Sequence, residues 1–120
     1  MARDHRKLDV FTIADDLAIS MYKSTATFPS SERFGLQSQL RRAAVSIPTN
    51  IVEGCGRDSE RDFVRFLDIA FGSAREVIYL LSLAKRLEFM EGTAAEKLEE
   101  LARRAAAGLA ALKKSIARRP

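Results

Sequence analysis

Apolar side chains recur every three or four residues along almost the whole chain, and this helical period constrains the fold more than any other feature of the sequence. The six glycines and three prolines fall mostly where such stretches end. No stretch of alternating apolar and polar residues is left over to predict a sheet. We therefore expect an all-α protein.

The pattern predicts four helices with recognisable boundaries. The first covers about residues 4–25, and the second begins near residue 36 and stops at Gly54-Cys55-Gly56. The third runs from an N-cap at Ser59 to about residue 89, and the last follows a capping box, Thr93-Ala-Ala-Glu96. Because the links are short, the sequence predicts an antiparallel up-and-down four-helix bundle that forms a single domain over residues 1–120.

Two features fit a lone bundle poorly. Pro48 lies inside the second helix, where it removes a backbone hydrogen bond and is expected to kink the helix. The third helix is apolar around more than half its circumference, with Phe71 and Tyr79 away from its main stripe. A thick core would explain this surface, but exposed aromatic residues favour an oligomer interface.

Composition excludes most enzyme classes. His5 is the only histidine, so a Ser-His-Asp or Cys-His site would depend on a residue near the chain terminus. Cys55 is the only cysteine, which allows neither an intrachain disulfide nor a multi-cysteine zinc site and indicates an intracellular, cytoplasmic protein. The most apolar stretch, residues 77–84, is too short to span a membrane, and no apolar signal sequence opens the chain. We expect no enzymatic activity, no cofactor, no metal and no membrane association.

A polar ribbon follows one face of the second helix at a spacing of three to four residues: Arg42, Ser46, Asn50, Glu53 and Arg57. On the third helix, Gly72, Ser73 and Glu76 form a small and polar patch. A satisfied network between the two helices, with Arg42 and Arg57 bonded to Glu53 or Glu76, is the favoured interpretation, and phosphate contact by the two arginines is the alternative. Nothing near the two carboxylates resembles a nucleophile or a metal-ligand set.

These same stretches carry a family resemblance. Residues 39–57 read Gln-Leu-Arg-Arg-Ala-Ala-Val-Ser-Ile-Pro-Thr-Asn-Ile-Val-Glu-Gly-Cys-Gly-Arg. Residues 63–76 read Phe-Val-Arg-Phe-Leu-Asp-Ile-Ala-Phe-Gly-Ser-Ala-Arg-Glu. Both closely resemble signatures of the bacterial four-helix bundle proteins encoded in 23S rRNA intervening sequences, with Val52 in place of an alanine. The loop from Phe28-Pro29 to Leu36 is similar to the linker of that family.

The resemblance implies a shape more than an activity. Members form antiparallel four-helix bundles and are similar to the accessory protein of diversity-generating retroelements, which assembles as a pentamer with a basic surface. It therefore implies a homo-oligomer, by analogy a pentamer, and an RNA or DNA partner. No enzymatic activity follows from the motifs.

The net charge of +4 is modest, but cations gather in three groups where phosphate would be recognised first. The candidate nucleic-acid contacts are Arg41, Arg42, Arg57, Arg61, Arg65, Lys113, Lys114, Arg118 and Arg119. Of these, Arg41, Arg61 and Arg65 are expected to face solvent, while the cations after residue 112 also complement a helix C-terminus. No base-reading motif is present, so binding should be directed at the backbone. The alternative function is an adaptor that recruits an acidic protein partner.

Overall fold

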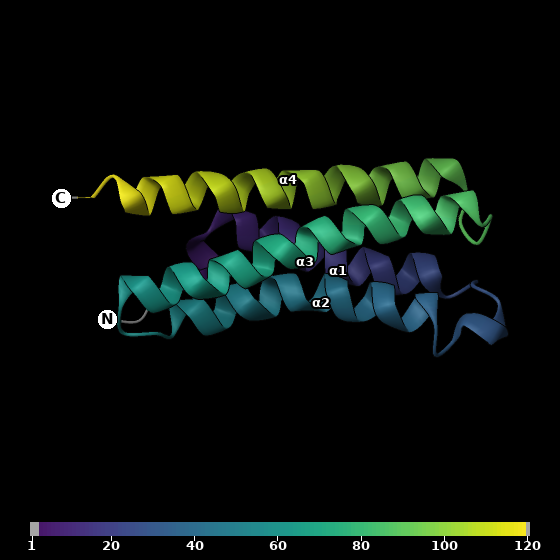
Figure 1. Ribbon diagram of the computed structural model, residues 1–120, viewed down its shortest axis with the longest axis horizontal. Helices are drawn as coiled ribbons and strands as arrows, with labels where there is room; N and C mark the ends of the chain where they lie inside the picture. The colour runs from purple at the N-terminus through teal and green to yellow at the C-terminus, as the bar shows by residue number, and fades with distance from the viewer. Residues whose placement is uncertain (1–2, 120) are drawn as a thin grey trace.

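Four α-helices lie side by side in the computed structural model, which describes residues 3–119 (Figure 1). They are α1 (Asp9–Thr25), α2 (Leu36–Cys55), α3 (Glu60–Arg86) and α4 (Gly92–Ala117), with short 3-10 helices η1 (His5–Lys7) and η2 (Ser30–Glu32) before α1 and α2. Consecutive helices run in opposite directions along a body 50 Å long. The predicted all-α, antiparallel four-helix bundle is confirmed.

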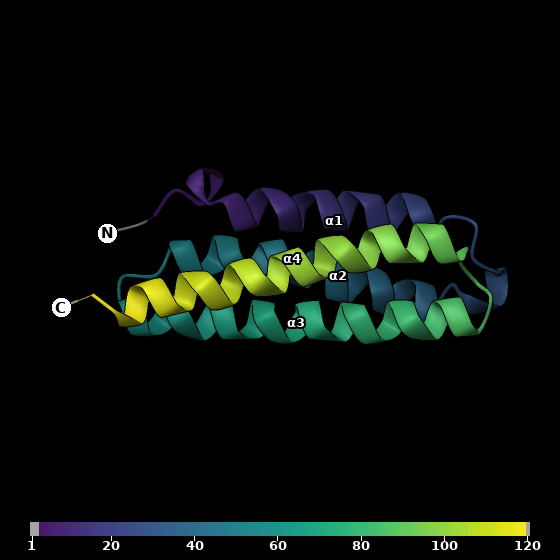
Figure 2. The same cartoon turned by 90° about the horizontal axis from the view of Figure 1, so that it is seen from above.

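The helices occupy the corners of a square cross-section. Each packs against its neighbours in the chain, and α1 also packs against α4. Figures 1 and 2 accordingly place α2 and α4 at opposite edges of the bundle, with α1 and α3 between them on either side. Each pair of adjacent helices therefore forms one long side, and α2 borders two of these sides.

The core is the shared interior of the four apolar stripes. Its largest fully buried side chains come from every helix: Leu17, Met21, Leu40, Ile47, Ile51, Phe63, Leu67, Val77, Leu81 and Leu109. Burying a side chain of this size contributes about 1.5–3 kcal/mol, so the stripes supply the main driving force for the fold. Within the described residues, no helix is long and apolar enough to cross a membrane.

Helix boundaries agree with the sequence where a cap is local and strong. The Ser59 hydroxyl accepts a hydrogen bond from the backbone N–H of Asp62 at 3.1 Å, which confirms the predicted N-cap of α3. The first helix is shorter than expected, because Asp4 caps η1 and α1 begins only at Asp9. The capping box at Thr93 is wrong: α4 begins one residue earlier, at Gly92, and has no side-chain cap.

The third helix also ends earlier than predicted, at Arg86. Glu88 adopts a left-handed backbone conformation, with φ of 62°, and the N–H of Phe89 bonds to the carbonyl of Ala84 at 3.0 Å. This is the closing pattern of a Schellman motif, which turns the chain toward α4. The ring of Phe89 then packs near Phe28, with 5.9 Å between the centroids.

Two expectations about the unusual residues have different outcomes. Pro48 is buried, and α2 continues through it as one helix from Leu36 to Cys55. Tyr79 is 59% exposed, as the apolar excess of α3 predicted. Phe71 is half-buried instead of exposed, because it packs on the core with the ammonium group of Lys113 5.7 Å from its ring.

The α2–α3 packing depends on a close approach at Gly54. A Cβ atom there would lie 2.9 Å from the Cβ of Phe66 and 3.1 Å from a ring carbon of Phe63. We expect Gly54→Ala to lower the free energy of unfolding by about 1–3 kcal/mol, because neither phenylalanine can move without disturbing the packed core around it. Urea unfolding measures this difference.

The matched control is Gly56→Ala, two residues further on. A Cβ at Gly56 would meet its nearest neighbour at an ordinary 3.5 Å. This variant should match the unmodified chain or exceed it by about 0.4–1 kcal/mol. Equal effects at the two positions would contradict a close approach of the helices at Gly54.

Candidate nucleic-acid interface

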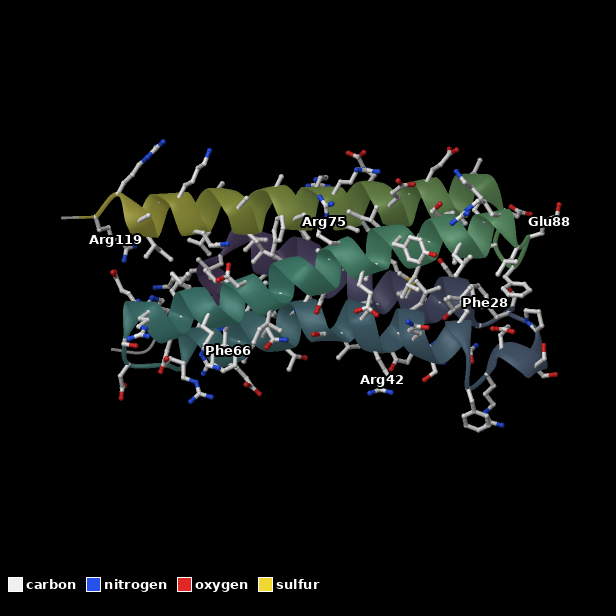
Figure 3. The ribbon with its side chains drawn as sticks, viewed as in Figure 1. Phe28, Arg42, Phe66, Arg75, Glu88 and Arg119 are labelled. Carbon is white, nitrogen blue, oxygen red and sulfur yellow. The ribbon has the colours of Figure 1, made fainter. Side chains whose placement is uncertain are left out.

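One end of the bundle gathers cations that lie far apart in the sequence. The end of α2, the start of α3 and the end of α4 meet there, and Figure 3 shows Phe66 and Arg119 toward this same end. The guanidinium group of Arg119 donates to Glu60 at 2.8 Å, and Lys113 forms an ion pair with Asp68. We call this surface the basic end, and it comprises Arg57, Arg61, Arg65, Lys113, Lys114, Arg118 and Arg119.

Acidic neighbours of the basic end are mostly engaged. Glu60 bonds to Arg119, Asp68 pairs with Lys113, and Asp62 lies 3.9 Å from Arg65. In the part of the chain that the structure describes, four cations of the basic end form no ion pair and only one nearby acid, Asp58, is likewise unengaged. Those cations are Arg57, Arg61, Lys114 and Arg118, and all four are exposed.

Phe66 organises two of the arginines. The guanidinium groups of Arg57 and Arg65 lie 4.7 and 4.9 Å from the centre of its ring. Stacking on an aromatic ring restrains a guanidinium group while leaving its N–H donors available. Along the start of α3, Arg61 and Arg65 also line a shallow hollow of about 600 Å³ together with Ser59 and Asp62.

Arg41 does not face solvent freely, and that expectation is wrong. It is half-buried, and its Nε donates to the Thr25 hydroxyl at 2.9 Å while a second nitrogen donates to the Tyr22 carbonyl at 3.1 Å. Its guanidinium group also lies 4.5 Å from the Tyr22 ring centre. Gln37 donates to the Thr25 carbonyl at 2.7 Å. We call Tyr22, Thr25, Gln37 and Arg41 the α1–α2 clasp.

The polar ribbon on α2 is an internal network only in part. The Ser46 and Ser73 hydroxyls are 2.8 Å apart, and the side-chain amide of Asn50 donates to the Ser46 carbonyl and hydroxyl at 2.7 and 3.0 Å. Glu53 and Glu76 remain exposed.

The expected ion pairs of the ribbon are wrong. In the described residues, neither Arg42 nor Arg57 forms an ion pair with Glu53 or Glu76, and Arg42 projects outward from α2 (Figure 3).

Residues with reactive side chains have structural surroundings. The His5 ring meets the Phe11 ring edge-on at 4.7 Å between centroids. Cys55 is 1% exposed, and burial raises the pKa of its thiol, which the nearby Arg3 charge offsets only in part. Among residues 3–119, no group of three or more His, Cys, Asp or Glu side chains is placed to hold a metal ion.

Comparison with known proteins places this chain. The sequence model of the 23S rRNA-intervening sequence protein family matches residues 6–111. The chain belongs to this family. A crystal structure from Bacteroides thetaiotaomicron VPI-5482, described as a protein with unknown function from the S23 ribosomal protein family, superposes with a TM-score of 0.79 and 26% identity, covering 88% of this chain and 98% of the other. A search of curated proteins finds no significant match.

The extent of the family match divides the basic end. Arg57, Arg61 and Arg65 lie inside the residues shared with the 23S rRNA-intervening sequence protein family, whereas the four cations after residue 112 lie beyond them. The ion pairs of Lys113 and Arg119 join the two groups across 45 and 59 residues of sequence. The sequence indicates the cations but not these acidic partners, because no local spacing signals a contact between α3 and α4.

The clasp leads to a stability prediction. Arg41→Ala should lower the free energy of unfolding by about 1.5–3 kcal/mol, because it removes charged hydrogen bonds and leaves an α1 carbonyl unpaired. The matched control is Arg42→Ala, one position along, where an exposed side chain is removed and a change within about 0.5 kcal/mol is expected. Urea unfolding of the two variants measures both, and equal decreases would contradict the clasp.

Burial of Cys55 leads to a prediction about pH. The folded pKa is raised, so the thiol stabilises the fold fully below the unfolded pKa of about 8.5 and that contribution is lost as pH rises toward the folded value. Above about pH 8.5, the free energy of unfolding should therefore fall more steeply in the unmodified chain than in Cys55→Ala, by at most about 1.4 kcal/mol per pH unit. Parallel curves through the alkaline range would contradict a buried thiol.

Proposed function

We propose that this chain is a non-enzymatic, oligomeric protein of the cytoplasm that binds the sugar–phosphate backbone of RNA or DNA through its basic end. The observation that carries the proposal is the surplus of unpaired cations there: Arg57, Arg61, Lys114 and Arg118, against the single unpaired acid Asp58 within the described residues. Guanidinium groups suit phosphate because their N–H donors form a fork that matches two oxygens.

The distribution of charge supports this choice of surface. Residues 57–68 and 113–119 together hold seven cations and four acids, so a net charge of +3 comes from these two short stretches. The whole chain carries +4. In a homo-oligomer the basic end recurs in every copy, and five copies, as the resemblance to the retroelement accessory protein implies, would carry about +20 in total.

Recognition would be directed at the backbone. Phe66, the aromatic ring at the basic end, is 7% exposed and covered by two arginines, so it offers no open surface for stacking a base. Binding then depends on release of counterions from the phosphates and should fall steeply with salt. The names of the family and of its structural relative, which refer to rRNA and to a ribosomal protein family, are consistent with this partner but state no activity.

The non-enzymatic part of the proposal rests on the surroundings of the reactive residues. His5 is stacked on Phe11, and Cys55 is buried with a raised thiol pKa, which disfavours the nucleophilic thiolate. Glu53 and Glu76 are exposed carboxylates, and neither belongs to a metal-binding group among residues 3–119. The chain therefore offers binding groups but no arranged set for general acid–base or covalent catalysis.

The test compares the salt dependence of binding between charge variants. Fluorescent single-stranded and duplex RNA and DNA are titrated with the unmodified chain and with Arg57→Gln/Arg61→Gln/Arg118→Gln over a series of salt concentrations. Each phosphate that the variant no longer neutralises should make the slope of log affinity against log salt shallower by about 0.7–0.9.

The matched control removes the same charge elsewhere, in Lys23→Gln/Arg75→Gln/Lys97→Gln, and should leave the slope of each binding site nearly unchanged. Identical slopes for the two triple variants would remove the basic end from the interface. Absence of nucleic-acid binding by the folded, unmodified chain would overturn the proposal and favour an adaptor that recruits an acidic protein.

A further inference from the structure

Gly72 stands in the middle of α3 without a reason inside the chain. It is exposed, its φ is not positive, and a Cβ atom at this position would meet no other atom within 4 Å. A glycine inside a helix costs about 0.5–1 kcal/mol relative to alanine. Gly54 offsets that cost by letting Phe66 approach, but nothing in the described chain approaches Gly72. A close approach by another molecule would account for it.

Large apolar side chains are exposed around Gly72. Ile69 and Tyr79 of α3 are 43% and 59% exposed, and Phe34, in the loop before α2, is 90% exposed. Between α2 and α3 a hollow of about 540 Å³ is lined by Phe34, Arg42, Ser46, Ser73 and Glu76 among others. We call this side of the bundle the α2/α3 face, and it comprises Phe34, Arg42, Glu53, Ile69, Gly72, Glu76 and Tyr79.

The charges on the α2/α3 face favour a protein occupant of mixed charge over a nucleic acid. Arg42, Glu53 and Glu76 are exposed, and within residues 3–119 none of them forms an ion pair. Two carboxylates would repel a phosphate backbone. A surface that carries both signs can be complemented by another copy of the same chain, whose exposed groups also have both signs.

A second apolar surface lies on the other side of α2. Ile19 and Tyr22 of α1 and Val45 and Val52 of α2 are exposed there, and we call these four residues the α1/α2 face. By contrast, no large apolar side chain of α4 is among the exposed ones in the described chain. The two unpartnered faces therefore share α2 as their common edge, and α4 lies at the opposite edge of the bundle (Figures 1 and 2).

We propose that the α2/α3 face of one copy docks on the α1/α2 face of the next copy, with Gly72 at the point of closest approach. Because the two faces differ, the contact is head-to-tail, and repetition closes a ring when the angle between the faces permits it. Faces that meet along α2 place α2 toward the inside of such a ring and α4 toward the outside. The inference rests on the oligomeric part of the proposed function and is independent of nucleic-acid binding.

The size of the surface is adequate for a stable contact. The bundle measures 50 Å by 21 Å along one long side. One such side presents an area of about 1,000 Å², compared with the ~800 Å² per partner that a standard specific interface buries. Exposed aromatic and aliphatic groups near its middle are the residue types that carry most of the binding energy in such contacts.

Gly72→Gln tests the docking contact. Since a side chain at this position has open space within one chain, the fold should be retained and urea unfolding should show no loss of stability. Assembly should fail, because the added side chain would occupy the place of the neighbouring copy. Sedimentation velocity without nucleic acid should show larger assemblies for the unmodified chain and a monomer for the variant.

The matched control is Ala111→Gln, an exposed small residue on the outer side of α4. It should assemble like the unmodified chain. If Gly72→Gln assembles equally well, or if the unmodified chain is itself a monomer, the docking proposal is overturned. Because no nucleic acid is present, neither outcome depends on the binding proposed for the basic end.

A mixing experiment tests the head-to-tail geometry. Val45→Glu places a charge on the α1/α2 face, so this variant alone should also be a monomer. When it is mixed with Gly72→Gln, each chain retains the face that the other lacks, and the mixture should form dimers and nothing larger. Dimers of either variant alone, or a mixture that stays monomeric while the unmodified chain assembles, would overturn the head-to-tail contact.

Discussion

The clasp between α1 and α2 fixes the orientation on which the surfaces of this protein depend. The last carbonyls of a helix have no partner within it, and here α2 supplies the donors: Gln37 bonds to the Thr25 carbonyl and Arg41 to the Tyr22 carbonyl. Thr25 is fully buried, and its hydroxyl both donates to the Met21 carbonyl and accepts from Arg41. These directional bonds add a defined rotation of α2 to the non-directional packing of its apolar stripe.

With that rotation set, the remaining features of the molecule follow. Arg42, the next residue, points outward, and Ser46 and Asn50 reach the seam with α3, where Ser46 meets Ser73. Gly54 then lies against Phe66, which brings the end of α2 close to the start of α3. The cations of both helices consequently gather at one end of the bundle, while the exposed apolar groups lie along its sides. Assembly along the sides would thus leave the basic end accessible to a phosphate backbone.

How much of this could be predicted from the sequence depends on the range of the interactions. The helices were predictable because their apolar period is local, and the Ser59 cap because its acceptor and donor are three residues apart. The roles of Arg41 and Arg42 were not, since both are exposed or buried according to how α2 rotates against a helix far away in the sequence. The ion pairs of the basic end join residues on different helices and leave no local pattern. For the same reason the open space beside Gly72 is visible only in three dimensions.

In the proposed assembly, other copies of the chain cover the two faces that share α2, while the basic end stays open. Hydroxyl-radical footprinting of the unmodified chain without nucleic acid, over a range of protein concentrations that spans assembly, tests this arrangement directly. Tyr22 and Tyr79 are exposed aromatic probes, one on each face. Both should lose reactivity as assemblies form, while the exposed arginines of the basic end keep theirs. Assemblies in which both tyrosines remain fully reactive would contradict the arrangement.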